Sequence, residues 1–216
     1  MQNCIYSFLS SAHKKFKALA PEKVGHNKNA KLPMSKILQY PELRVNPFGD
    51  RICKVFSSSQ DGDCTFEDFL DVMSVFSDTA PKTVKAEHVF RIFDFDGDDM
   101  LGVGDLRKVV DRLTTPQRLN DSDMHQLLQY ILDEADLDDD GALNFAEFEH
   151  ITEKSSDFSN NDKIFLQEFS HSFIKVNVVN GELAHERLNI NRHFIIIADM
   201  GLMHTLEKGK IMINVC

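Results

Sequence analysis

The sequence has no apolar run long enough to cross a membrane. A spanning helix needs about 20 consecutive apolar residues, and no segment here approaches that length. The apolar stretch 4–9 is too short for the core of a signal peptide and follows no cationic segment. Position 2 is glutamine, so the glycine that myristoylation requires is absent. We expect a cytoplasmic protein that reaches the inner face of the plasma membrane only indirectly, through a partner.

Cysteine is scarce, and signatures of catalysis are missing. The four cysteines form no C-x-x-C pair, which indicates reduced thiols of a cytosolic or nuclear protein and not a disulfide framework. The histidines His88, His125 and His150 stand singly, without a nucleophile or a metal-ligand pattern. No glycine-rich phosphate loop occurs. We therefore expect no enzymatic activity.

Positive charge is in deficit, with 24 Lys+Arg against 34 Asp+Glu and a net charge of −10. Ten of the acidic residues lie in two short segments, 94–105 and 136–147. Outside these segments, acidic and basic residues are equal in number. The surplus negative charge therefore belongs to the two segments, and the balanced remainder argues against a nucleic-acid-binding surface.

Segment 136–147 has the length and spacing of an EF-hand calcium loop. Gly141 supplies the turn at position 6, and Leu143 at position 8 points inward to pair with a sister loop. Asn144 at position 9 is placed to contribute through a water. The remaining oxygen donors stand at positions 1, 3, 5, 7 and 12, with the position 7 donor being a backbone carbonyl: Asp136, Asp138, Asp140, Ala142 and Glu147.

Segment 94–105 repeats the pattern with two departures. Position 6 is Asp99 instead of glycine, and position 12 is Asp105, which is one methylene shorter than glutamate. A monodentate closing ligand suits octahedral Mg²⁺ better than seven-coordinate Ca²⁺. We expect a weaker, Mg²⁺-tolerant site here, the alternative being a loop kept only as a structural partner. Its donors are Asp94, Asp96, Asp98, Met100 (through its carbonyl) and Asp105.

Two further segments have EF-hand character without the ligands. Segment 57–68 has serine at positions 1 and 3, which leaves Asp61 and Asp68 as its inward charges. Segment 21–32 has no carboxylate at a coordinating position if it is a decayed first loop. Since hands pair around a shared core, we expect an all-α EF-hand protein with a degenerate N-terminal lobe (1–80) and a cation-binding C-terminal lobe (81–166).

Helix boundaries are predicted from apolar spacing and capping residues. Apolar side chains at helical spacing favour an amphipathic helix within 1–19. Asn46 followed by Pro47 predicts one helix start. Asn120 with Asp123 three residues later predicts another.

Five segments together resemble the calcium- and integrin-binding protein family, a branch of the EF-hand superfamily near calcineurin B and the neuronal calcium sensors. They are 41–48 (PELRVNPF), 51–57 (RICKVFS), 66–71 (FEDFLD), 74–78 (SVFSD) and 90–96 (FRIFDFD). The resemblance covers roughly residues 10–166. It implies two non-binding N-terminal hands and two working C-terminal hands. It also implies partners that offer amphipathic helices, such as integrin α-subunit cytoplasmic tails, kinases or channel subunits.

Residues 167–216 extend beyond this resemblance. Segments 173–179 and 193–198 have strand-like content, with a turn signal at Asn180-Gly181. A small hairpin, a poorly ordered extension and a translated non-coding segment are all compatible with this pattern, and we favour poor order. A further alternative is that 195–203 covers an apolar groove as a built-in plug.

The expected function is that of a Ca²⁺- and Mg²⁺-binding sensor or adaptor. In sensor hands, cation binding changes the angle between paired helices and exposes a groove that accepts a helix of the partner. Alternatives are a regulatory subunit held constitutively on an enzyme, as calcineurin B is, and a plain ion buffer. Candidate groove residues, each of which could instead be plain core, are Phe76, Ile92, Leu113, Leu127, Leu128 and Ile131.

Overall fold

A computed structural model describes residues 2–24, 30–77, 79–116 and 118–154. The described chain is mostly helical, with one two-stranded sheet, which confirms the all-α prediction. Its elements in order are α1 (Gln2–Leu19), α2 (Pro21–Val24), α3 (Met34–Ile37), α4 (Pro41–Arg44), α5 (Gly49–Phe56), α6 (Phe66–Val75), α7 (Lys82–Phe93), β1 (Leu101–Gly102), α8 (Val103–Thr114), α9 (Asp121–Ala135), β2 (Ala142–Leu143) and α10 (Phe145–Lys154).

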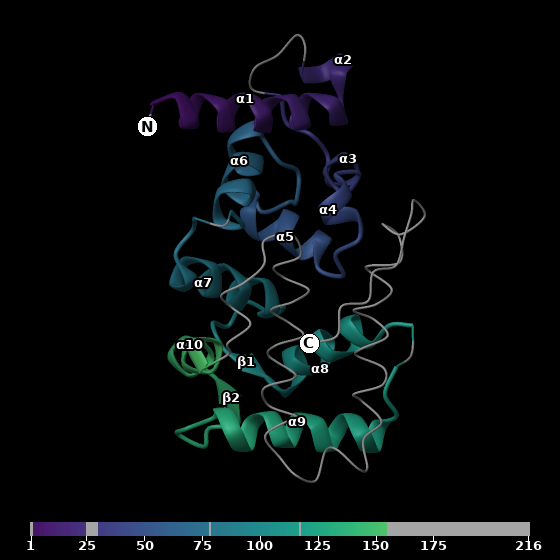
Figure 1. Cartoon of the computed structure of the whole chain (residues 1–216). Helices are drawn as coiled ribbons and strands as arrows, with labels where there is room; N and C mark the ends of the chain where they lie inside the picture. Colours follow the sequence, from purple (N-terminus) through teal and green to yellow (C-terminus); the bar gives the residue numbers. More distant parts are fainter. Residues whose placement is uncertain (1, 25–29, 78, 117, 155–216) are drawn as a thin grey trace, which may run out of the picture.

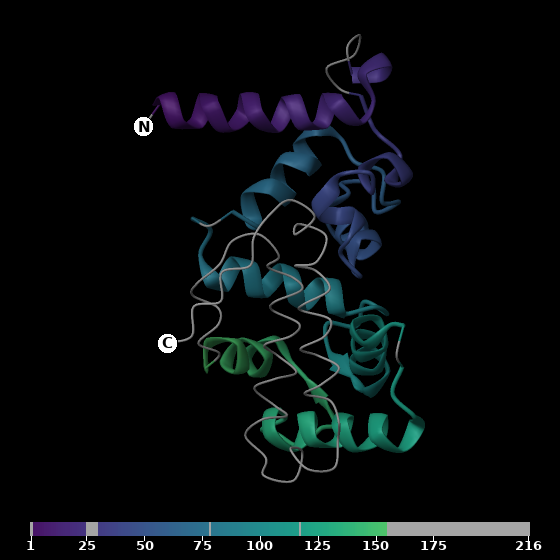
Figure 2. The same ribbon diagram turned by 45° about the vertical axis from the view of Figure 1, so that its right-hand side comes forward.

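The helices stack along one axis of the molecule. In both ribbon views α1 crosses one end and α9 crosses the other, with α5, α6, α7 and α8 between them (Figures 1 and 2). Among the described residues, no helix combines the length and the apolar content that crossing a bilayer requires. The expectations for 167–216, including the segments 173–179 and 193–198 and the plug at 195–203, lie outside the described residues.

Local capping explains where two of the helices begin. Thr65 and Asp68 form a reciprocal capping box at the start of α6. Asn120 accepts the backbone N–H of Asp123 at 2.9 Å, which confirms the predicted start of α9. These side chains satisfy N–H groups that have no partner inside the helix.

The predicted helix start at Asn46 and Pro47 was wrong, because α5 begins at Gly49. Asn46 accepts the N–H of Phe48 at 2.8 Å and so forms a turn ahead of the helix. A Cβ at Gly49 would lie 2.5 Å from the carbonyl oxygen of Leu43. The chain therefore turns at Asn46 and passes close to the backbone of α4 at Gly49 before the helix starts.

The hands pair through short antiparallel contacts between their loops. Leu101 pairs with Leu143 in the two-stranded sheet formed by β1 and β2. An isolated bridge joins Leu32 to Cys64 in the same manner. Cys64 is position 8 of loop 57–68, as Leu101 and Leu143 are of their loops, whereas Leu32 is the last residue of 21–32. The bridge therefore does not support 21–32 as the bounds of a decayed loop.

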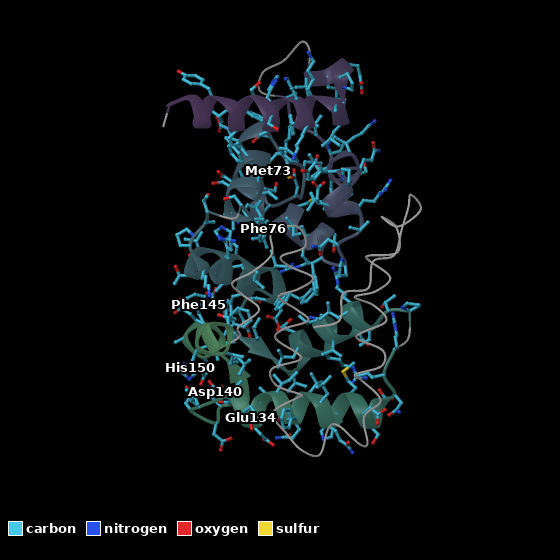
Figure 3. All side chains as sticks on the ribbon, viewed as in Figure 1. Met73, Phe76, Glu134, Asp140, Phe145 and His150 are labelled. Carbon is cyan, nitrogen blue, oxygen red and sulfur yellow. The ribbon has the colours of Figure 1, made fainter. Side chains whose placement is uncertain are left out.

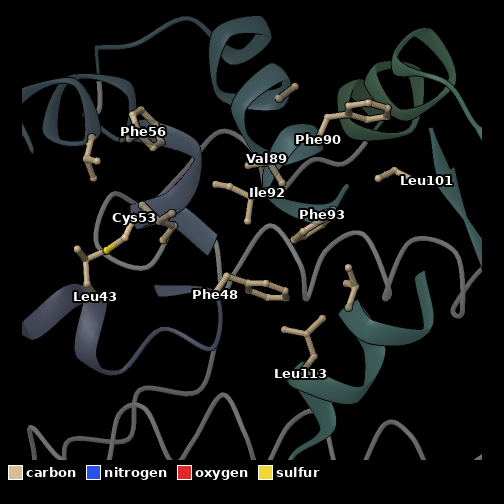
Figure 4. Packing of buried hydrophobic residues seen from close by; sticks show 14 of the residues in the cluster. Leu43, Phe48, Cys53, Phe56, Val89, Phe90, Ile92, Phe93, Leu101 and Leu113 are labelled. Atoms are coloured by element: carbon tan, nitrogen blue, oxygen red, sulfur yellow. The ribbon is translucent and has the colours of Figure 1, made fainter. Parts of the chain in front are cut away.

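One apolar cluster runs through the described chain from Phe16 to Ile151. Its centre lies where α5, α7 and α8 meet, and Figure 4 shows Phe48, Phe93 and Leu113 converging there. The rings of Phe48 and Phe93 are 5.1 Å apart. The cluster is continuous across residue 80, so the division into lobes at that residue stays a prediction.

Two arginines join α5 to the second half of the chain by polar contacts. Arg112 of α8 donates to both carboxylate oxygens of Asp50, at 2.5 and 3.0 Å, and to the carbonyl of Pro47 at 2.9 Å. Burial opposes ionisation of Asp50, but the Arg112 guanidinium lowers the pKa of that carboxyl overall. Arg51 donates to the carbonyls of Ile92, Arg91 and Asp94. These bonds cap the end of α7 with a cation, where the helix dipole is negative.

Replacing Arg112 with alanine tests this connection. We expect Arg112→Ala to lower the free energy of unfolding by about 1–3 kcal/mol, because a bidentate ion pair and the contact of its guanidinium group with the Phe48 ring are both lost. Arg107→Ala on the same helix removes an exposed pair with Asp121 and should change stability by less than about 1 kcal/mol. Urea unfolding curves check both, and equal losses would contradict the assignment.

Candidate metal centre

The loop between α7 and α8 gathers four carboxylates. Asp94, Asp96, Asp98 and Asp105 each place an oxygen within 4.8 Å of the others. Asp94 and Asp105 are buried, and the other two are exposed. Hard divalent cations such as Ca²⁺ and Mg²⁺ prefer oxygen ligands of this kind. The donor set therefore fits a divalent cation.

Backbone N–H groups orient these carboxylates within the loop. Asp94 accepts the N–H groups of Gly97 and Asp99, one on each oxygen, at 2.6 and 3.1 Å. Asp98 accepts from Met100 at 2.9 Å. The Oδ1 atom of Asp105 accepts from the N–H of Phe95 at 3.1 Å. The loop backbone therefore fixes the orientation of the carboxylate oxygens. The carbonyl of Met100 as an ion ligand stays a prediction.

The second acidic loop, between α9 and α10, brings together three of its predicted ligands. Asp136, Asp138 and Glu147 place oxygens within 4.8 Å of one another. Glu147 is buried, and its two oxygens accept the N–H groups of Leu137 and Asn144 at 2.8 and 2.9 Å. A side chain of the first turn of α10 is therefore hydrogen-bonded to the loop at Leu137 and at Asn144.

Asp140 lies outside this group of three, although it belongs to the same loop (Figure 3). Its Oδ1 accepts the N–H of Ala142 at 3.0 Å. Asp98 makes the equivalent bond in the other loop and yet stays within its group. Asp140 and the carbonyl of Ala142 remain predicted ligands.

Both loops have left-handed backbone at two positions, of which the spacing of the sequence predicted only position 6. Asp99 at position 6 has φ 64°, as its place in the pattern implied, while Gly97 at position 4 has φ 78°. In the other loop the order is reversed, since Asp139 has φ 60° and Gly141 has φ 86°. Each loop thus holds one glycine and one aspartate at this pair of positions. The Asp-Gly-Asp-Asp order at 96–99 was the signal that could have shown it.

Crowding of carboxylates changes their titration. Desolvation, together with the charges of Asp105 and Asp98, raises the pKa of Asp96. Desolvation and neighbouring charges, that of Asp140 first among them, raise the pKa of Asp138. Desolvation also opposes ionisation of Asp136, but N–H groups of the loop lower its pKa overall. A bound dication would relieve the repulsion that contributes to the raised pKa values of Asp96 and Asp138.

In loop 57–68, the carboxylates of Asp61 and Asp68 accept hydrogen bonds from neighbouring protein groups. Ser59 donates to Asp61 at 2.9 Å, and Lys31 of the preceding hand donates to the same carboxylate at 2.6 Å. The hydrogen bond from Lys31 is the main reason that the pKa of Asp61 is lowered. Asp68 accepts from Thr65 and Ser58. These contacts support the prediction of a structural, non-binding hand, and Lys31 is a contributor that sequence reasoning missed.

The six candidate groove residues belong to the apolar cluster or pack against it. Phe76 is partly buried at the end of α6, next to α7 (Figure 3). The groove assignment stays a prediction. The other five are buried: Ile92, Leu113, Leu127, Leu128 and Ile131.

Neutralising Glu147 should remove ion binding at its loop. Glu147→Gln takes away one charge and the bidentate grip, so the tighter calorimetric transition with Ca²⁺ should disappear. Glu149→Gln changes the same charge on the same helix and should leave both transitions in place. Two intact transitions in Glu147→Gln would refute the assignment.

The paired left-handed positions give a second prediction. A non-glycine residue there costs about 1–2 kcal/mol, so Asp99→Gly should tighten Ca²⁺ binding at loop 94–105. Asp139→Gly should tighten loop 136–147 by a similar factor. Calorimetry on both variants checks this, and a gain at only one loop would show that the other aspartate is held there by contacts of its own.

Comparisons with known proteins match the same region. The model of the EF-hand domain pair covers residues 83–153. The chain is 40% identical to calcium and integrin-binding family member 2 of Drosophila melanogaster over 152 residues, which is 68% of this chain and 80% of that protein. It is 41% identical to the human protein of that name over 150 residues, again 68% and 80%. With this identity over most of each relative, the chain belongs to the calcium- and integrin-binding protein family.

Proposed function

We propose that the chain is a non-enzymatic regulatory protein that binds Ca²⁺ at both acidic loops and responds by binding an amphipathic helix of a partner protein. One observation carries the proposal. The two carboxylate loops are joined by the pairing of Leu101 with Leu143, and both of these leucines are fully buried in the apolar cluster. Any change in either loop is therefore transmitted directly to the core.

Glu147 supports a mechanical role for the ion. It lies in the first turn of α10, and the same helix carries Phe145 and Phe148 against Phe90 of α7, with ring centroids 5.7 and 5.5 Å apart. When Glu147 turns toward an ion, α10 moves with it. That motion shifts aromatic contacts between α10 and α7, which is how sensor hands open an apolar surface.

The relatives' names indicate integrin binding for those proteins, and we propose an integrin α-subunit cytoplasmic tail as the partner of this chain. Such a helix would place its i, i+3, i+4 and i+7 side chains on the candidate groove residues. Kinases and channel subunits that offer an amphipathic helix are proposed partners of the same kind. We also propose that Mg²⁺ binds loop 94–105, and that the protein is cytoplasmic and meets the membrane only through its partner.

A calorimetric titration tests the proposal on the full chain. An integrin α-tail peptide is titrated in Ca²⁺, in Mg²⁺ and in chelator, with a proline-interrupted peptide as control. We expect Ca²⁺-dependent binding of the intact peptide, loss of binding in Glu147→Gln, and an increase in hydrophobic-dye fluorescence on adding Ca²⁺. The control peptide should not bind, because proline breaks the helix that presents the anchors.

Other outcomes separate the alternatives. Binding that persists in chelator would favour a constitutive subunit. Ca²⁺ uptake without peptide binding or a change in dye fluorescence would favour an ion buffer. Absence of bound ions in native mass spectrometry would overturn the proposal.

A further inference from the structure

We propose that Lys108, an exposed lysine of α8, holds one oxygen of the buried closing ligand Asp105, and that it thereby sets the affinity and the ion preference of loop 94–105. This inference rests on the proposed ion binding. It assigns a role to a residue outside the 12-residue loop, one turn along α8.

The contact is direct. Lys108 Nζ lies 3.2 Å from Asp105 Oδ1, and that same oxygen accepts the N–H of Phe95 at 3.1 Å. Asp105 is buried, with 2% of its surface exposed, so few other donors can reach it. With Oδ1 engaged twice, Asp105 has Oδ2 left for an ion. A single oxygen at position 12 is the arrangement that octahedral Mg²⁺ accepts, while Ca²⁺ gains from two.

The lysine is also held in place over the loop. Its ammonium group lies 5.1 Å from the centre of the Phe95 ring, which belongs to position 2 of the same loop. Arg51 and Arg112 also approach this ring, at 4.8 and 5.0 Å. Their nitrogens donate to main-chain carbonyls and to Asp50. Within the described residues, Lys108 is therefore the one cation in an ion pair with a predicted ligand.

The other acidic loop offers a natural comparison. The residue three positions after its closing ligand is His150, which is exposed (Figure 3). In the described part of the chain, no basic side chain forms an ion pair with Glu147. Both oxygens of Glu147 accept backbone N–H groups, which carry no net charge. The two loops thus differ in the charge beside position 12 as well as in the length of the side chain there.

The test is a calorimetric titration of the full chain with Ca²⁺ and with Mg²⁺. Lys108→Gln should tighten Ca²⁺ binding at the weaker site on the order of tenfold, because it removes a positive charge a few ångströms from the dication and frees an oxygen. Mg²⁺ affinity should rise less, so the Ca²⁺ to Mg²⁺ ratio shifts. The transition of loop 136–147 serves as the internal reference and should not move.

Arg107→Gln is the matched control. It makes the same charge change one residue earlier, where the side chain pairs with Asp121 in solvent, and it should alter Ca²⁺ affinity by less than about threefold. Lys108→Arg keeps the charge and should behave like the wild type. Lys108→Met, which removes the charge but keeps a long unbranched side chain, replaces the glutamine variant if that one does not fold.

Thermal unfolding gives a readout that needs no ion. In chelator, Lys108→Gln should lower the midpoint relative to Arg107→Gln, since buried Asp105 loses its cationic partner. In saturating Ca²⁺, the unfolding midpoint of Lys108→Gln should instead lie above that of Arg107→Gln. Identical behaviour of the two variants in both conditions would overturn the role of Lys108 while leaving ion binding intact. A wild-type titration without a second, weaker transition would overturn ion binding at this loop, and the inference with it.

Discussion

Repulsion among crowded carboxylates is the constraint on which the second half of this chain depends. Four such groups meet in loop 94–105 and three in loop 136–147. The backbone turns its N–H groups inward at each loop, and this needs left-handed φ at two positions in each. The fold holds like charges together with main-chain donors, which leaves a place for a dication.

The loops are not isolated from the rest of the molecule. Leu101 and Leu143 connect them to each other within the apolar core. Arg51 of α5 donates to the carbonyl of Asp94, the first residue of a cation loop. The N-terminal hands, which we predict to bind no ion, therefore support the cation loops through packing and through polar contacts that cross the chain. This agrees with the prediction that the 57–68 hand is structural.

Differences between the two loops follow from small changes in local chemistry. Asp105 is shorter than Glu147 and shares an oxygen with Lys108, while Glu147 accepts only backbone N–H groups among the described residues. The exchange of glycine and aspartate between positions 4 and 6 leaves both loops with one strained non-glycine residue. Turn strain therefore does not separate the loops, whereas the length of the side chain at position 12 and the charge beside it do.

The sequence by itself determined the helical class, the family and the positions of the cation loops. Ligand spacing, apolar periodicity and caps such as Asn120 involve residues close together in sequence, so they can be recognised from the sequence alone. Only the tertiary structure decided that α5 begins at Gly49, that Lys31 neutralises Asp61, and that Arg51 reaches Asp94. The two side-chain contacts join residues distant in sequence, and the start of α5 depends on the approach of its backbone to Leu43. All three depend on how the helices pack together.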